Sequence, residues 1–154
     1  MGYISDIRKK VGHDAIFMPS AGCGIIKNGK ILLQKRVDNG KWATHGGSLE
    51  LGETFLDAVK REIKEELNIE IINPELVNIY SGDKMHFVYP NNDEVFIIAA
   101  IYLVKEYEGE LKPDYEEVSE VKWFDIDNLP DNLHQPDIQA IRDIITFYKK
   151  SNWI

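Results

Sequence analysis

Apolar and polar positions along the chain predict several strands with helices between them. Residues 15–26 and 31–36 are expected to be extended, with Pro19 interrupting the first segment, and the Lys-Asn-Gly-Lys sequence at 27–30 predicts a hairpin turn between them. Residues 85–89 and 94–104 form a second candidate antiparallel pair, and the apolar run within the latter is typical of a strand buried on both faces. Shorter extended segments are predicted at 42–44, 69–72, 75–80 and 118–126.

Apolar residues recur at the spacing of a helix in three segments. Residues 1–12 are expected to form a short N-terminal helical extension, which could pack on the domain or take part in a homodimer contact. A longer helix is predicted at 55–67, and a C-terminal helix at 136–150 begins with Pro136 in its first turn. The polar residues 105–112 are predicted to form a surface turn. Strands, a helix, more strands and a final helix indicate one α+β domain over 1–154, with a mixed sheet between helices.

On a helical wheel, the 55–67 segment has an apolar arc with a cluster of acids at its margin. Thr54 with Asp57 predicts the start of the helix, and Asn68 predicts a left-handed end. Acids at this spacing repel one another, and more strongly when they are partly desolvated, so a hard divalent cation is the expected counter-charge. The arc contains Phe55, Leu56, Val59, Ile63 and Leu67, and the acids are Glu62, Glu65 and Glu66.

The stretch from residue 47 to residue 69 resembles the signature of the Nudix hydrolases, the family of MutT-like proteins. The matching positions are Gly47, Glu53, Arg61, Glu62, Ile63, Glu65, Glu66 and Ile69. Two positions depart from the family pattern: Asn68 stands where glycine is usual, and His45 stands where many members have proline. The resemblance implies a Nudix-like α/β/α sandwich with a mixed central sheet.

The resemblance also implies a metal site and a reaction. Glu62 and Glu66 would be the principal ligands of Mg²⁺ or Mn²⁺, Glu65 would join them directly or through water, and the carbonyl of Gly46 would be a further ligand. Arg61 is expected to orient a glutamate through a bidentate pair. The implied reaction is attack of water on one phosphorus of a diphosphate. The alternative for these acids is a solvated helix face that forms surface pairs with lysines.

The partner of Arg61 is expected to be Glu53, whereas the general base is left open. Glu53 and Glu65 are candidates for it, as is an acid that precedes the last strand. Those later acids are Asp114, Glu116, Glu117 and Glu120. Glu117 is counted among the catalytic candidates, and the alternative is that this segment is only a solvated turn before a strand.

Substrate contacts are predicted around the glycine loop. Arg36 could pair with a phosphate or could form only a surface ion pair. Trp42 and His45 could stack on a base or could pack in the core, and Gly47 lets the backbone come close to another group. The aromatic residues that might line a nucleoside pocket, about half of which are expected in the core instead, are Tyr80, His86, Phe87 and Tyr89.

Composition narrows the classes of ligand that the protein is expected to bind. The formal net charge of −8 argues against long nucleic acid as a ligand and disfavours RNA decapping, but it leaves small nucleotides open because a metal can neutralise their phosphates. No apolar run approaches the roughly 20 residues of a membrane span. The single cysteine, Cys23, is expected to be a small core residue, and it favours a reducing cytoplasm as the location.

The leading prediction is therefore a Mg²⁺-dependent pyrophosphohydrolase that acts on a nucleoside diphosphate linked to another moiety. Candidate substrates are nucleoside triphosphates, ADP-ribose, nucleotide sugars and dinucleoside polyphosphates. The alternative is a non-catalytic Nudix-like module that binds a nucleotide as a sensor. Retention of Glu53, Glu62, Glu65 and Glu66 favours the enzyme.

Overall fold

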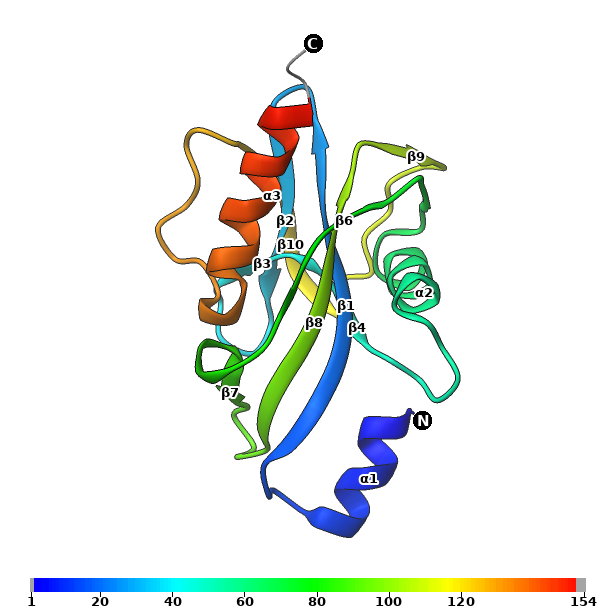
Figure 1. Ribbon diagram of the computed structural model, residues 1–154, viewed down its shortest axis with the longest axis vertical. Helices are drawn as coiled ribbons and strands as arrows, with labels where there is room; N and C mark the ends of the chain where they lie inside the picture. Colours follow the sequence, from blue (N-terminus) through cyan, green and yellow to red (C-terminus); the bar gives the residue numbers. More distant parts are fainter. Residues whose placement is uncertain (1, 152–154) are drawn as a thin grey trace.

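A curled mixed sheet separates two helices in the computed structural model, which describes residues 2–151 (Figure 1). Helix α2 (Phe55–Leu67) packs on one face and helix α3 (Ile138–Ser151) on the other. The strands are β1 (Ile16–Lys27), β2 (Lys30–Arg36), β3 (Trp42–Ala43), β4 (His45–Ser48), β5 (Glu70–Ile72), β6 (Glu75–Tyr80), β7 (His86–Val88), β8 (Glu94–Val104), β9 (Glu106–Glu108) and β10 (Val118–Asp125). The predicted α+β sandwich is confirmed.

The sheet has the order β10-β2-β1-β8-β6, with β3 paired to β2, β4 to β1 and β7 to β8. Strands β1 and β8 run parallel and the other pairs are antiparallel, which makes the sheet mixed. The predicted hairpin turn at Asn28-Gly29 joins β1 to β2, and both of its residues have positive φ. The predicted pairing of the segments around 86–88 and 94–104 is likewise confirmed, although β8 is continuously buried only over 99–104, with Val95 as the one buried residue before it.

Two apolar cores hold the layers together. One lies between the sheet and α2 and includes Val59, Ile63 and Leu67, and the other lies between the sheet and α3 and includes Ile141 and Ile144. Each helix therefore has a fixed orientation on the sheet, because its apolar side is buried and its polar side is solvated. No helix within residues 2–151 is long and apolar enough to cross a membrane.

Helix α1 (Tyr3–Val11) lies apart from these layers, near the loop that leads into α2 (Figure 1). None of its residues is buried. Two short 3-10 turns, Asp83–Met85 and Gln135–Asp137, precede β7 and α3. Pro136 lies in the second of these turns, so α3 itself begins later than the sequence predicted.

Three sequence predictions about local structure are wrong. Pro19 does not interrupt β1: its carbonyl accepts a hydrogen bond from the amide of Leu49 (2.9 Å), so the side of the strand where proline lacks an N–H faces the loop and not β8. The segment 105–112 is not only a turn, because Tyr107 pairs with Ile71 in a small β5–β9 sheet. Leu56 is 38% exposed, and Ala58 takes its place in the buried arc of α2.

Candidate active site

Capping residues determine where α2 begins and ends, and thereby where its acids lie. The hydroxyl of Thr54 accepts a hydrogen bond from the amide of Asp57 (3.0 Å), and the Asp57 carboxylate accepts one from the amide of Thr54 (3.1 Å). At the other end, Asn68 has the predicted left-handed conformation, with φ of 62°. Because Val59 and Ile63 are fully buried, the helix is held against the sheet and takes its acids with it.

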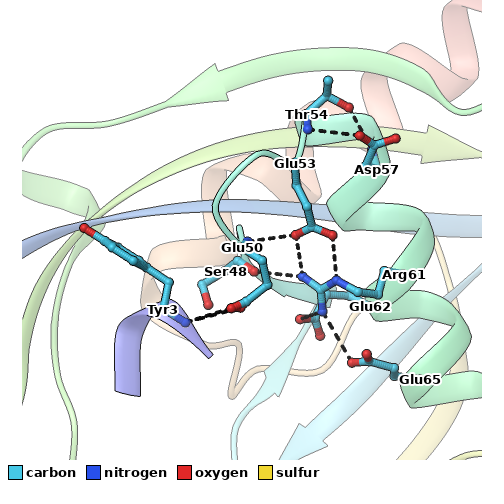
Figure 2. A network of polar contacts seen from close by, with 9 residues as sticks. All are labelled: Tyr3, Ser48, Glu50, Glu53, Thr54, Asp57, Arg61, Glu62 and Glu65. Atoms are coloured by element: carbon cyan, nitrogen blue, oxygen red, sulfur yellow. Dashed lines mark hydrogen bonds and ion pairs between the residues drawn. The ribbon is translucent and has the colours of Figure 1, made fainter. Parts of the chain in front are cut away.

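Arg61 is the centre of a polar network that joins α2 to the preceding loop (Figure 2). Its Nε donates to Glu53 Oε2 (2.7 Å) and its second terminal nitrogen donates to Glu53 Oε1 (2.8 Å), so the predicted bidentate pair is present. Another N–H donates to Glu62 Oε1 (2.8 Å). The hydrogen bonds from Arg61 lower the pKa of Glu53 to about 2. Glu53 is therefore a weak proton acceptor in this arrangement.

Glu62 lies against the glycine loop. A Cβ atom at Gly47 would overlap its carboxyl group, so only glycine lets the loop approach this closely. Burial raises the pKa of Glu62 to about 7, and the nearby negative charge of Glu66 adds to the rise against the opposing effect of Arg61. The site therefore holds more negative charge than Arg61 alone neutralises.

Glu66 is buried, with 4% of its surface exposed. Its Oε2 accepts a hydrogen bond from the amide of Gly46 (3.1 Å), and its Oε1 accepts one from the side-chain amide of Gln34 (3.1 Å). His45 Nδ1 lies 3.8 Å from Oε1, which is too long for a hydrogen bond. These contacts orient Glu66 toward the same region as Glu62.

A cleft opens beside these two carboxylates. Glu117, an exposed residue of the segment before β10, lines it, and partial desolvation raises the pKa of its carboxyl, with a further rise from Glu66, Asp114 and Glu65. The walls of the cleft are formed by Gln34, Arg36, Val37, Asp38, Gly46, Glu62, Glu66, Tyr89 and Glu117. The predicted acids from two distant parts of the sequence thus meet at one place.

The donor set of this cleft fits a hard divalent cation. Glu62, Glu66 and Glu117 offer carboxylate oxygens, the ligand type that Mg²⁺ and Mn²⁺ prefer. The raised pKa of Glu62 shows that its negative charge is poorly compensated, which a cation would correct. Among residues 2–151, no three acids, histidines or cysteines already have the geometry to hold a metal, and hydrogen bonds reach Glu62 Oε1 and both oxygens of Glu66.

The remaining candidate bases lie outside the walls of the cleft. The side chain of Glu65 is 51% exposed and has a 3.5 Å contact with Arg61. Asp114 instead supports the local backbone, because its carboxylate accepts a hydrogen bond from the amide of Glu116 (3.0 Å). Glu116 and Glu120 are exposed. Of the four acids that precede or begin β10, Glu117 alone lines the cleft.

A cavity of about 210 Å³ adjoins the cleft and shares several wall residues with it. Phe87 and Tyr89 contribute aromatic surface to its wall, with ring centroids 4.9 Å apart in an edge-to-face arrangement. Arg36 lines both spaces, forms a two-point pair with Asp38 (2.8 and 2.6 Å) and lies over the Phe87 ring. The shared wall residues are Gln34, Arg36, Gly46 and Tyr89.

Several substrate-site predictions are corrected. The ring of Trp42 is buried against Phe124, with centroids 4.7 Å apart, and it does not line the cavity. Tyr80 instead donates a hydrogen bond to Asp143 (2.6 Å), and His86 pairs with Glu94 (2.7 Å). Trp42 and Tyr80 lie on the α3 side of the sheet, as the cavity does, but pack beside it without lining it, whereas His86 precedes Phe87 in β7 and points to the other side of that strand.

His45 contributes to the wall of the cavity but is completely buried. Neither of its ring nitrogens has a hydrogen-bond partner among the described residues. Cys23, which pairs with His45 between β1 and β4, is buried as predicted, and burial raises the pKa of its thiol.

The sequence interpretation missed several polar residues of the cavity, among them Thr44, His134 and Asp137. Asp137 Oδ2 accepts hydrogen bonds from the amide (2.9 Å) and the hydroxyl (3.0 Å) of Thr44, and burial raises its pKa. Burial, helped by Arg36, lowers the pKa of His134 to about 4, so this ring is neutral near pH 7. Only the position of Asp137 next to Pro136, at the predicted start of a helix, could have signalled its place.

Comparison with known proteins agrees with this geometry. The NUDIX domain family model matches residues 17–144. An NAD-capped RNA hydrolase, NudC of Vibrio vulnificus, is 34% identical over 120 residues, which cover 77% of this chain and 42% of that protein. An ADP-ribose pyrophosphatase of Methanocaldococcus jannaschii is 38% identical over 112 residues, which cover 70% of this chain and 62% of that protein. The chain therefore spans less than half the length of this NudC relative.

The solved structures show the same architecture. A MutT NUDIX hydrolase from Burkholderia pseudomallei superposes with a TM-score of 0.72 at 27% identity, covering 84% of this chain and 98% of that one. The family match spans both the loop and α2, together with the strand that carries Arg36 and the segment before β10 that carries Glu117. On the matched sequence and the shared fold together, the chain belongs to the NUDIX family.

Proposed function

We propose that this protein is a Mg²⁺- or Mn²⁺-dependent pyrophosphohydrolase that cleaves a nucleoside diphosphate linked to another moiety. The observation that carries the proposal is the meeting of Glu62, Glu66 and Glu117 at one cleft that adjoins an aromatic-lined cavity. A substrate with phosphates in the cleft and its nucleoside in the cavity would use both spaces.

In this proposal Glu62 and Glu66 hold the cation, with Glu65 and the Gly46 carbonyl as further ligands. When bound, the cation polarises a phosphoryl oxygen and lowers the pKa of a coordinated water. Arg61 keeps Glu62 oriented through its 2.8 Å hydrogen bond, and Glu53 in turn holds the guanidinium group in place. Glu117 is the proposed proton acceptor, supported by its position in the cleft and by the raised pKa that partial desolvation gives it.

The cavity residues would bind the remainder of the substrate. Phe87 and Tyr89 offer faces for a nucleobase, and Arg36 lies between the cavity and the cleft, where it can meet a phosphate. Gly47 would leave room for the backbone beside Glu62. A cytoplasmic location and a homodimer stay predictions from the sequence.

The decisive experiment follows turnover by phosphorus NMR in the presence of Mg²⁺. The panel contains nucleoside triphosphates, ADP-ribose, a nucleotide sugar, a dinucleoside polyphosphate and a short NAD-capped RNA, because relatives are named for acting on ADP-ribose and on NAD-capped RNA. Release of two phosphate-containing products from at least one compound is expected. Binding without cleavage across the panel would favour the nucleotide sensor.

A substitution of one cleft residue, Glu62, tests whether turnover depends on the cleft. Glu62→Gln keeps an oxygen that can accept the hydrogen bond of Arg61 but removes the negative charge. We expect its kcat to fall about a hundredfold or more, since metal-based charge stabilisation is worth several kcal/mol. Glu70→Gln, at an exposed position of β5, is the matched control and should retain activity. Equal activity of Glu62→Gln and the unmodified protein would mean that the metal binds at other residues.

A further inference from the structure

Helix α1 lies outside the part of the chain that matches the NUDIX family model, yet its first turn contacts the loop that precedes α2. The amide of Tyr3 donates to both carboxylate oxygens of Glu50, at 2.7 and 3.3 Å. A Cβ atom at Gly2 would lie 2.8 Å from the same oxygens, so glycine lets the Glu50 carboxylate approach without shifting. Glu50 thus occupies the position at which a negative charge stabilises a helix N-terminus, where amides lack partners within the helix.

The other end of α1 is fastened in a similar way. The guanidinium group of Arg8 donates to the carbonyls of Gly12 (2.9 Å), Asp14 (2.6 Å) and Glu94 (2.7 Å). Its Nε also lies 3.6 Å from the carboxylate of Asp93. No residue of α1 is fully buried, and Ile4 and Ile7 are half-buried, so these polar contacts at its two ends add to a small apolar contact in holding the helix in place.

The contact with Glu50 continues into the candidate active site (Figure 2). The amide of Glu50 donates to Glu53 Oε1 (2.8 Å), and Glu53 holds Arg61 through two further hydrogen bonds. Arg61 then donates to Glu62 Oε1 (2.8 Å). A continuous series of hydrogen bonds therefore runs from the first turn of α1 to the carboxylate that lines the cleft.

The loop is otherwise fixed by a hydrogen bond from the Glu53 amide to the Glu50 carbonyl (3.1 Å) and by one from Arg61 to the Ser48 carbonyl (3.2 Å), and its tip adds little. Leu51 is 81% exposed, and Gly52 has a positive φ of 88°, so the tip of the loop contributes no buried side chain. Leu49 is held by the Pro19 carbonyl and packs partly against the core, before the tip begins. Beside the tip, the Glu50 side chain is hydrogen-bonded to α1, and Leu51 lines a pocket with Tyr3 and Ile7 of that helix.

We propose that α1 is a clamp on this loop and that Glu50 is a positioning residue, which acts through Glu53 and Arg61 on the orientation of Glu62. The catalytic part of this inference rests on the proposed pyrophosphohydrolase activity. The mechanical part, fixation of the loop by α1, does not. Glu50 is not one of the positions that carry the resemblance to the family signature.

The test compares Glu50→Ala, Glu50→Gln and the charge-matched control Glu70→Ala in the full chain. Hydrogen exchange measures the mobility of α1 and of residues 49–53, and Mn²⁺ titration followed by electron paramagnetic resonance measures metal binding. In Glu50→Ala both segments should exchange about tenfold faster or more, and the Mn²⁺ dissociation constant should rise severalfold, on the order expected for one lost charge-assisted contact. Glu50→Gln keeps one acceptor oxygen, so its exchange rates and its Mn²⁺ dissociation constant should change less than those of Glu50→Ala.

Kinetics add a readout that simple destabilisation of the fold would not reproduce. With a substrate from the panel, Glu50→Ala should lower kcat about tenfold and change KM less than about twofold, because the nucleoside cavity is untouched. Unchanged exchange in residues 49–53, or an unchanged Mn²⁺ dissociation constant, would overturn the clamp even in an active protein. If no compound is cleaved, the proposed activity fails, whereas exchange and Mn²⁺ binding still decide the clamp.

Discussion

At the scale of single residues, Glu62 is notable because it is ionisable, partly buried and close to another acid. The pKa of about 7 lies above the ordinary value of 4.5, so the folded protein binds a proton more tightly than the unfolded chain. The resulting stability is fully present below about pH 4.5 and is lost as the pH rises through about 7. The charge that suits a metal ligand thus lowers stability when no metal is bound.

We therefore predict that metal-free protein loses about 1–2 kcal/mol of unfolding free energy through Glu62 between pH 4.5 and pH 8, after allowance for partial solvent access. Glu62→Gln should lack this part of the pH dependence. Urea unfolding in EDTA at several pH values measures it. Parallel pH profiles for the two proteins would show that Glu62 titrates normally.

His45 is the other residue whose environment leads to a prediction. Its buried ring nitrogens have no partner among the described residues, and an unsatisfied buried polar group costs about 1–3 kcal/mol. His45→Leu is therefore expected to raise the free energy of unfolding by about 1 kcal/mol. Urea denaturation of the metal-free protein provides the measurement.

His134 offers the matched comparison. It is also buried, but its Nδ1 accepts a hydrogen bond from Asn39 (3.1 Å), and its ring packs edge-on against Phe87. The same change, His134→Leu, should therefore lower stability by about 1 kcal/mol. A loss of stability in both variants would mean that the His45 ring is stabilising despite its lack of a partner.

At the scale of elements, one departure from the family pattern can be tested: Asn68, at the left-handed end of α2, stands where glycine is usual. Asn68 has φ of 62° and ψ of 26°, a conformation that asparagine and glycine adopt readily and alanine does not. Asn68→Ala should lower the free energy of unfolding by about 1 kcal/mol, while Asn68→Gly should stay within about 0.5 kcal/mol of the unmodified protein. Thermal or urea unfolding distinguishes them, and equal losses in both variants would assign the effect to the contact of the Asn68 side chain with Glu110.

Features that depend on residues close together in the sequence were predictable from it. The Thr54–Asp57 cap, the Asn28-Gly29 turn and the end of α2 depend on residues a few positions apart, and all three are present. Strand β9 was missed because its partner, β5, lies about thirty residues earlier in the chain, so nothing in its own short sequence indicates the pairing. Pro19 was misread because the tolerance of a strand for proline depends on which neighbour faces its nitrogen.

At the scale of the whole molecule, the acidic half of the candidate site was predictable and the cavity was not. Glu53, Arg61, Glu62 and Glu66 lie within one loop and one helix, so their spacing fixes their arrangement. The cavity forms only where β2, β7 and the start of α3 come together, which periodicity cannot specify. Asp137 and His134 were missed for that reason, and Trp42 packs in the core next to the cavity without lining it.

The attachment of α1 has one more consequence. The body of the protein is held by buried apolar side chains, whereas this helix is held at its ends by a carboxylate and a guanidinium group. Dissolved ions weaken attraction between charges, less so where the groups are partly buried as Arg8 and Glu50 are, and leave apolar burial intact or strengthen it. Ionic strength can therefore loosen one end of the molecule while the remainder keeps its shape.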